Sequence, residues 1–215
     1  MGGQPGFGRI PLSPEADEAV FQTIWEARVF ALTTAIESLG KWNLDESRHA
    51  IESQNSEEYS EKSYYENWLF GLEKLLVQTG LLTSEELTTG IVELNPGLEE
   101  LTSLRADQVE DYVYDNFSTH ADHPSPTRFK TGDVVTAVTL PSIGHTRLPR
   151  YVQGKQGKVS KQLGIHLLPD QNARGTAVPE RCYSVFFSAT QLWGHQGDAG
   201  FGVNVDLWES YLESV

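Results

Sequence analysis

The sequence is poor in cysteine, and it has no long run of apolar residues. Its single cysteine, Cys182, excludes a disulfide framework within the chain and a cysteine-rich metal site. Because free cysteine is among the residue types most often buried, we expect Cys182 to be a buried strand residue. No apolar stretch approaches the about 20 residues that a membrane helix needs. Residues 1–8 lack the basic start and apolar core of a signal peptide, so the chain is expected to be cytoplasmic.

Basic residues are scarce, with 16 Lys and Arg against 30 Asp and Glu, and the formal net charge is −14. The charge is uneven along the chain. Residues 1–110 hold 20 acidic and 7 basic residues, whereas the remainder holds 10 and 9. An acidic N-terminal half argues against binding to nucleic acid or to anionic membrane surfaces, because both need clustered cations.

Several familiar motifs are also absent. The chain has no P-loop, no dinucleotide-binding glycine fingerprint, no nucleophile elbow and no cluster of metal ligands. His120 and His123 stand three apart, but nothing near them completes a site, so no metal site is predicted in this chain. Aromatic residues are abundant, with 5 Trp, 8 Tyr and 9 Phe, and such residues anchor protein interfaces. The residues alone thus indicate a soluble two-part protein that binds another chain.

The spacing of apolar residues changes along the chain from a helical period to a strand period. The first part predicts helices at 18–39, after Asn43, at 61–79, after Thr83 and at 99–115. The last part predicts strands near 133–139, 150–160, 164–168, 182–188 and 202–208. Five short strands in so few residues suggest a small SH3-like β-barrel.

The predicted fold class is therefore α+β, with an N-terminal helical domain followed by a C-terminal small SH3-like β-barrel. The expected boundaries are 18–116 for the helical domain, 117–127 for a linker and 128–215 for the barrel. Residues 1–17 are rich in glycine and proline. They form either an extended N-terminal arm that wraps another chain or a frayed terminus.

Two groups of side chains are candidates for function. His145, Arg147 and Arg150 stand in a loop between predicted strands, where arginine forks could bind oxyanions, although the loop by itself favours a solvated basic turn. Tyr64 and Trp68 lie four apart on one helix face, which is also typical of an aromatic core stripe.

Short motifs along the chain resemble, in order, those of the nitrile hydratase beta-subunit family. They are Gly6-Phe7-Gly8 with Pro11, Phe21 to Trp25-Glu26, Asp45-Glu46-Ser47-Arg48, Ser63 to Leu69, Gly144 to Val152, and Leu192-Trp193-Gly194 with Val205 to Glu213. Each motif alone is weak, but their shared order is specific. Residues 81–127 match poorly.

The resemblance implies an enzyme that hydrates nitriles to amides, a hydro-lyase that is active only with an alpha subunit. The alpha subunit holds a low-spin Co(III) or Fe(III) ion in a claw of cysteines, two of them oxidised, and this chain has no such claw. The expected assembly is a heterodimer or a two-plus-two heterotetramer. The loop at 144–147 and Trp68 are more similar to the cobalt branch, and the short chain is more similar to the iron branch.

The resemblance also assigns roles to residues. Arg48 and Arg147 match two arginines that clamp the oxidised cysteines, and Tyr64 matches a tyrosine that orients the site. Glu52 and His145 match a carboxylate and an imidazole that support the metal ligands from outside. The substrate pocket wall is matched by Phe30, Leu44 and Trp68.

Two positions depart from the family pattern. Asn67 stands where many cobalt-type relatives carry histidine, and Ser47 replaces a bulky pocket residue of some relatives, which would widen the pocket. Alternative interpretations are a thiocyanate hydrolase-type subunit, a non-catalytic activator or metal-loading partner, or a generic interaction module. Activators lack the complete pair of pocket helices, so Arg48 together with Tyr64 and Trp68 favours a catalytic subunit.

Overall fold

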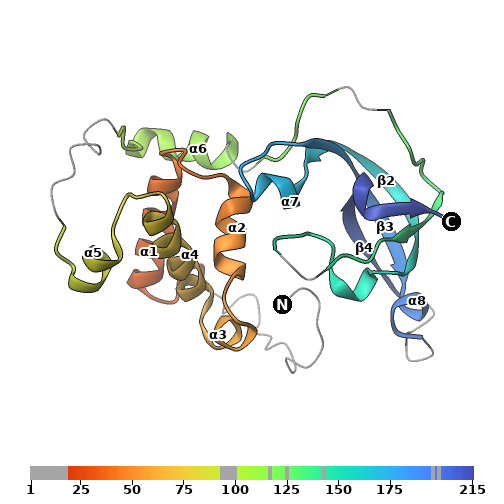
Figure 1. Ribbon diagram of the computed structural model, residues 1–215, viewed down its shortest axis with the longest axis horizontal. Helices are drawn as coiled ribbons and strands as arrows, with labels where there is room; N and C mark the ends of the chain where they lie inside the picture. The colour runs from red at the N-terminus through yellow and green to blue at the C-terminus, as the bar shows by residue number, and fades with distance from the viewer. Residues whose placement is uncertain are drawn as a thin grey trace. The chain divides into compact units, whose positions relative to one another are not determined.

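A computed structural model of the chain describes residues 19–92, 101–115, 118–123, 126–141, 144–194, 197 and 200–215. The chain divides into two compact units, a helical unit that ends at Ser118 and a sheet unit at Thr119–Val215 (Figure 1). The extended arm predicted at 1–17 lies outside the described residues. Across the described ranges, no helix combines the length and apolar character that a membrane span requires.

The helical unit is built from short helices with polar caps. They are α1 (Ile24–Glu37), α2 (Leu44–Glu52), α3 (Ser56–Glu61), α4 (Tyr64–Gln78), α5 (Ser84–Thr89), the 3-10 turn η3 (Ala106–Gln108) and α6 (Val109–Asp115). The predicted Asn43 and Glu46 capping pair opens α2. The Asn43 side chain accepts from the backbone N–H of Glu46, and the Glu46 carboxylate accepts from the backbone N–H of Asn43. Thr83 and Glu86 form the predicted capping box of α5.

Three helix predictions need correction. The first helix begins at Ile24 instead of residue 18, because Thr23 and Glu26 form a capping box that fixes its start. No helix was predicted in the polar stretch 53–60, but this stretch contains most of α3, which Asn55 caps. Of the helix predicted at 99–115, the structure has only the last part, which forms η3 and α6.

A cluster of apolar side chains forms the core of the helical unit. Its buried members are Trp42, Ala50, Leu72, Leu75, Leu76 and Leu81. Helices α2 and α4 approach closely where Gly71 faces Ile51. A Cβ atom added at Gly71 would lie 2.5 Å from Ile51 Cγ1 and 3.3 Å from its backbone nitrogen. The missing side chain of Gly71 therefore sets the distance between the two helices that carry Arg48 and Trp68.

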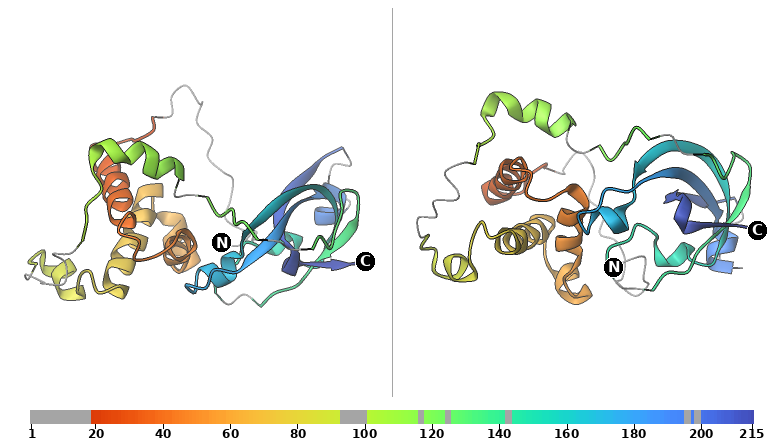
Figure 2. Two further views of the ribbon diagram at one scale, coloured as in Figure 1. Left: turned by 90° about the horizontal axis from the view of Figure 1, so that it is seen from above. Right: turned by 45° about the horizontal axis from the view of Figure 1, so that its top comes forward.

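The sheet unit holds a five-stranded antiparallel sheet in the order β4-β3-β2-β1-β5. The strands are β1 (Val134–Ala137), β2 (Gln156–Leu167), β3 (Pro179–Ser188), β4 (Gly202–Trp208) and β5 (Leu212–Ser214). Short helical segments join them, namely η4 (Arg150–Val152), α7 (Pro169–Asn172), α8 (Ala189–Trp193) and η6 (Glu209–Tyr211). Long β2 and β3 bend along their length (Figure 2).

The sheet is strongly curved but open. Strands β4 and β5 are its two edges, yet η6 supplies only 3 residues between them. Such a link spans at most about 14 Å, whereas the edges of a flat five-stranded sheet lie about 19 Å apart. The sheet must therefore curl. Among the described strands no pairing joins β4 to β5, so the closed SH3-like barrel is not confirmed.

The strand predictions differ from the structure at β2 and β5. The two strands predicted at 150–160 and 164–168 are one strand, β2, whose register against β3 shifts between Gln162 and Gly164. Gly164 has φ +101°, a left-handed conformation that suits glycine at a bulge. Residues 150–152 form η4, and β5 was not predicted. Part of the predicted linker, at 119–121, pairs with the far end of β2.

Candidate functional site

A pocket of about 280 Å³ lies within the helical unit. Its wall comes from α1, from the α1–α2 connection, and from α2 and α4. The lining residues are Thr33, Glu37, Trp42, Leu44, Ser47, Arg48, Ile51, Tyr64, Trp68, Leu72 and Leu75. On α2 and α4 these residues recur every three or four positions, so each helix turns one continuous face to the pocket. The pocket thus brings together four predicted site residues: Leu44, Arg48, Tyr64 and Trp68.

Aromatic rings form one side of this pocket. Tyr64 and Trp68 contact each other with ring centroids 5.6 Å apart, and Phe30 of α1 packs on Trp68 at 6.1 Å. Phe30 does not line the pocket itself but contacts Trp68, which does. Tyr64 remains 66% exposed, so its side chain is accessible on the surface of this chain. The tyrosine and the tryptophan offer apolar faces to a small organic ligand.

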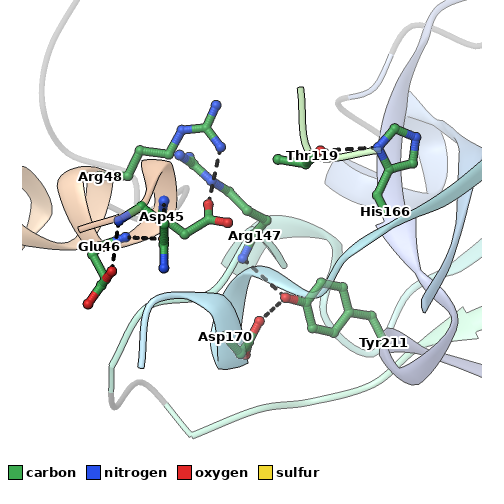
Figure 3. A network of polar contacts seen from close by, with 9 residues as sticks. Asp45, Glu46, Arg48, Thr119, Arg147, His166, Asp170 and Tyr211 are labelled. Atoms are coloured by element: carbon green, nitrogen blue, oxygen red, sulfur yellow. Dashed lines mark hydrogen bonds and ion pairs between the residues drawn. The ribbon is translucent and has the colours of Figure 1, made fainter. Parts of the chain in front are cut away.

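The Arg48 guanidinium is held by a buried carboxylate on the same helix. Arg48 Nη1 lies 3.2 Å from Asp45 Oδ1, three residues earlier, and the Asp45 side chain is fully buried whereas that of Arg48 is 39% exposed (Figure 3). Asp45 in turn belongs to the start of α2, where its N–H donates to Asn43. A charged hydrogen bond from a rigid helix start restricts where the arginine fork can point.

Another part of the pocket wall is polar. Ser47 Oγ donates a 2.7 Å hydrogen bond to the Glu37 carboxylate, so α2 and α1 meet through this pair. Burial raises the pKa of Glu37 above 4.5 and outweighs the opposing effects of Ser47 and the nearby Trp42 indole. A small serine at position 47 leaves room that a bulky residue would occupy. The pocket therefore has an aromatic wall and a polar wall that holds a desolvated acid.

The predicted arginine loop lies in the sheet unit and is anchored by Tyr211 of η6. The Tyr211 hydroxyl accepts hydrogen bonds from Thr146 Oγ1 at 3.3 Å and from the backbone N–H of Arg147 at 3.4 Å. It donates its own proton to the carboxylate of Asp170 on α7 (Figure 3). Leu148 then enters the core of the sheet unit. One buried hydroxyl thus fixes the backbone of the loop at Arg147.

Burial of Tyr211 has an electrostatic consequence. Desolvation raises the pKa of Tyr211 well above its usual range, and the hydrogen bond to Asp170 adds to this shift. The phenol therefore stays protonated and keeps donating to Asp170. His145, two residues before Arg147, is also buried, whereas Arg150 is exposed at the start of η4.

Some residues of the site were predicted from the sequence, and others were not. Glu52 lies on an exposed part of α2 and does not line the pocket. Asp45 was missed as the partner of Arg48, although its i,i+3 spacing was a usable signal. Tyr211 and Asp170 stand 41 residues apart. No local pattern could have joined them.

The described residues do not fit a resident metal. No group of three or more His, Cys, Asp or Glu side chains within the described ranges could hold a metal ion. Cys182 lies buried in β3, and burial raises the pKa of its thiol to about 12, which disfavours the thiolate that binds metals. His120 faces His166 of β2 with ring centroids 5.6 Å apart. His166 Nδ1 is itself within hydrogen-bond distance of the Thr119 hydroxyl (Figure 3).

Two family models match the chain. The nitrile hydratase beta subunit, N-terminal family matches residues 1–112, and the nitrile hydratase beta subunit, C-terminal family matches residues 118–214. The cobalt-containing nitrile hydratase subunit beta of Pseudonocardia thermophila is 37% identical over 222 residues, covering 100% of this chain and 94% of the relative. The low-molecular weight cobalt-containing nitrile hydratase subunit beta of Rhodococcus rhodochrous is 34% identical, covering 99% and 96%.

A solved structure is also similar. It is a thiocyanate hydrolase from Thiobacillus thioparus, a recombinant apo-enzyme, with a TM-score of 0.42 and 22% sequence identity. The match covers 53% of this chain and 100% of that chain.

Proposed function

Because this chain belongs to the nitrile hydratase beta-subunit family, we propose that it acts as the beta subunit of an enzyme that adds water to nitriles and gives amides. The observation that carries the proposal is the pocket that joins Arg48, Tyr64 and Trp68 in one helical unit. It combines an apolar wall for the organic group of a nitrile with a guanidinium that can bind oxyanions.

The metal centre and part of the active site belong to an alpha subunit in this proposal. The described residues here offer no set of metal ligands, so the Co(III) or Fe(III) ion is carried by the partner. Relatives named as cobalt-containing favour cobalt. The chain is then active only in a complex with an alpha subunit, as a heterodimer or a two-plus-two heterotetramer.

Arg48 and Arg147 are proposed to bind the oxygen atoms of oxidised cysteine ligands on the alpha subunit. Arginine suits this task because its planar fork donates two parallel hydrogen bonds to an oxyanion and stays charged. Two features of this chain support the roles. Asp45 orients the side chain of Arg48, and Tyr211 fixes the backbone of Arg147. Buried anions are costly unless they are paired and hydrogen-bonded, which is the contribution of the two arginines.

The remaining residues are proposed to shape the substrate site. Trp68 and Leu44 provide the apolar wall with Phe30 behind it, and the Tyr64 hydroxyl orients the site. Glu52 and the buried His145 are proposed to support the metal ligands of the alpha subunit from outside. We further infer that the curved sheet is an open form of the SH3-like barrel, with β4 and β5 brought near each other by η6.

The test is co-expression with an alpha subunit, purification through a tag on this chain, and assay of amide formation from acrylonitrile and benzonitrile. Metal per complex is quantified in parallel. We expect a metal-loaded complex that turns over nitriles, with kcat/KM at least about 100-fold lower in Arg48→Ala, comparable to loss of a charge-stabilising donor.

Two further variants sharpen the test. Arg48→Lys keeps the charge but loses the fork, so activity should also fall. Arg28→Ala removes an exposed guanidinium of α1 outside the pocket and should leave activity intact. A complex that converts only thiocyanate would change the substrate but keep the architecture. Full activity in Arg48→Ala, or the absence of any metal-containing complex, would refute the proposed role.

A further inference from the structure

The polar wall of the pocket contains two buried groups whose hydrogen bonding is incomplete. Within the described part of the chain, Thr33 Oγ1 has no hydrogen-bond partner. Trp42 Nε1 makes no hydrogen bond of ordinary length, although its N–H points to the Glu37 carboxylate closely enough to lower the pKa of that group. The two residues are only 5% and 8% exposed. Both line the pocket, next to Glu37 and Ser47. Thr34, the neighbour of Thr33, instead donates its hydroxyl to the Phe30 carbonyl at 2.9 Å within its own helix. Thr33 of α1 and Trp42 of the α1–α2 connection therefore both bring an incompletely bonded group to the pocket.

Such groups are expected to bind a ligand or water, because a buried polar atom without a partner costs free energy. The chemistry of the wall defines what fits. The Trp42 indole N–H only donates, the Thr33 hydroxyl donates or accepts, and the Glu37 carboxylate accepts. A ligand that satisfies them must accept at one atom and donate through the same or an adjacent atom. A hydroxyl or a primary carboxamide does so.

From this arrangement we propose that the pocket selects nitriles that carry a distal neutral hydroxyl or carboxamide group, which hydrogen-bonds to Thr33, Trp42 and Glu37. The inference rests on the proposed function, since it takes the pocket as the site of the organic group of a nitrile. The aromatic wall of Tyr64 and Trp68 contacts the carbon chain, and the polar wall recognises its far end. A carboxylate tail is disfavoured, because Glu37 would face a second anion.

The desolvation of Glu37 supports the choice of a neutral group. Burial raises the pKa of Glu37, because the charged carboxylate is poorly solvated in the pocket wall, so a neutral hydrogen-bonding group suits this wall better than a second anion. Ser47 already occupies one of its oxygens through the 2.7 Å bond. A ligand hydroxyl could donate a second hydrogen bond to the other carboxylate oxygen of Glu37 without adding charge to the pocket.

The test compares nitriles in matched pairs on the purified complex with its alpha subunit. Each ω-hydroxynitrile of three, four or five carbons is paired with the alkyl nitrile in which a methyl group replaces the hydroxyl. A hydroxyl loses its hydration on entering the pocket, and this cost is the same in every variant. The informative quantity is therefore the change in the hydroxyl-to-methyl ratio of kcat/KM between a variant and wild type. Thr33→Val has nearly the same shape without the hydroxyl, and Thr34→Val is its matched control.

We expect Thr33→Val to lower the hydroxyl-to-methyl ratio by about 3- to 10-fold for at least one chain length, the size of one hydrogen bond. Trp42→Phe should lower it in the same direction, and Thr34→Val should leave it unchanged. A ratio that neither variant changes would overturn the inference and leave ordered water as the occupant of the polar wall.

A direct binding measurement separates this inference from the proposed function. The hydroxyamides and alkylamides that correspond to the same pairs are titrated into the complex by calorimetry. If no nitrile is hydrated, the proposed function fails, yet tighter binding of hydroxyamides that is lost in Thr33→Val would still establish the polar subsite. If nitriles are hydrated but no such difference appears in rate or binding, only the subsite is refuted.

Discussion

Removing the Tyr211 hydroxyl should loosen the loop that carries Arg147. In Tyr211→Phe, Asp170 loses a charged hydrogen bond worth about 1.5 kcal/mol, the low end of the range because this carboxylate is only half-buried. Thr146 and the Arg147 N–H lose bonds of 3.3 and 3.4 Å, which we take as about 0.5 kcal/mol each. The free energy of unfolding should therefore fall by about 2.5 kcal/mol, well below a typical total of about 5–15 kcal/mol.

Tyr183 provides the matched control. It is a fully buried tyrosine of β3 whose hydroxyl donates to Glu209 at 2.5 Å and accepts from the Phe129 N–H at 3.4 Å. Tyr183→Phe should lose a similar amount of stability without touching the arginine loop. Only Tyr211→Phe should speed hydrogen exchange of the Arg147 amide and lower kcat/KM for nitriles, by about 10-fold for a displaced binding group.

The assays are urea unfolding, exchange mass spectrometry on peptides that cover 144–153, and nitrile hydration by the complex. If Tyr211→Phe and Tyr183→Phe lose equal stability and keep equal activity, anchoring of Arg147 has no role in the reaction. If Tyr211→Phe changes neither stability nor exchange at Arg147, the hydrogen-bond network itself is refuted.

Three further perturbations follow from burial and close packing. The raised pKa of Glu37 means that its contribution to stability is present below pH 4.5 and is lost as the pH rises, so the stability of Glu37→Gln relative to wild type should increase from pH 4 to pH 7 in urea titrations. Burial raises the pKa of Tyr183 from 10.0 to about 12, so wild-type stability should drop across that interval more steeply than that of Tyr183→Phe. Gly71→Ala should destabilise the helical unit by about 1–2 kcal/mol in urea unfolding, because overpacking against Ile51 outweighs the better helix propensity.

Each of these has a contrary outcome. A constant difference between Glu37→Gln and wild type across pH would mean that the carboxyl is not desolvated in solution. Parallel alkaline curves for Tyr183→Phe and wild type would assign the alkaline loss to other groups. A Gly71→Ala variant as stable as wild type would show that α2 and α4 can separate at no cost.

The helical pocket was expected from the family resemblance and not from local spacing. The resemblance placed Leu44, Arg48, Tyr64 and Trp68 at the site, and the pocket is lined by all four. Local spacing alone predicted that Tyr64 and Trp68 share one helix face. Caps such as Asn43 are also local, because a side chain bonds a backbone group two or three residues away. The catalytic roles of these residues remain predictions.

Features that depend on distant partners were not predictable. The short strand β5 has only 3 residues and is defined by its pairing with β1, so its own sequence carries little signal. The open edges of the sheet depend on how distant strands pair with one another. The alternation of apolar and polar residues along one strand does not specify that pairing. The unmet Thr33 and Trp42 groups result from the packing of α1 against α4 and the α1–α2 connection.

The pairing of β1 with β5 also affects how the protein folds. Val135 pairs with Ser214, 79 residues further along the chain, whereas the contacts of α1, α2 and α4 join segments close in sequence. Local contacts form faster than distant ones, because less chain entropy is lost on closing the loop. We therefore expect pulse-labelling exchange to show protection in α4 before β1, and simultaneous protection would contradict this order. Arg147, held by Tyr211 just before β5, is then positioned late, so the binding surface of this chain matures after its hydrophobic pocket.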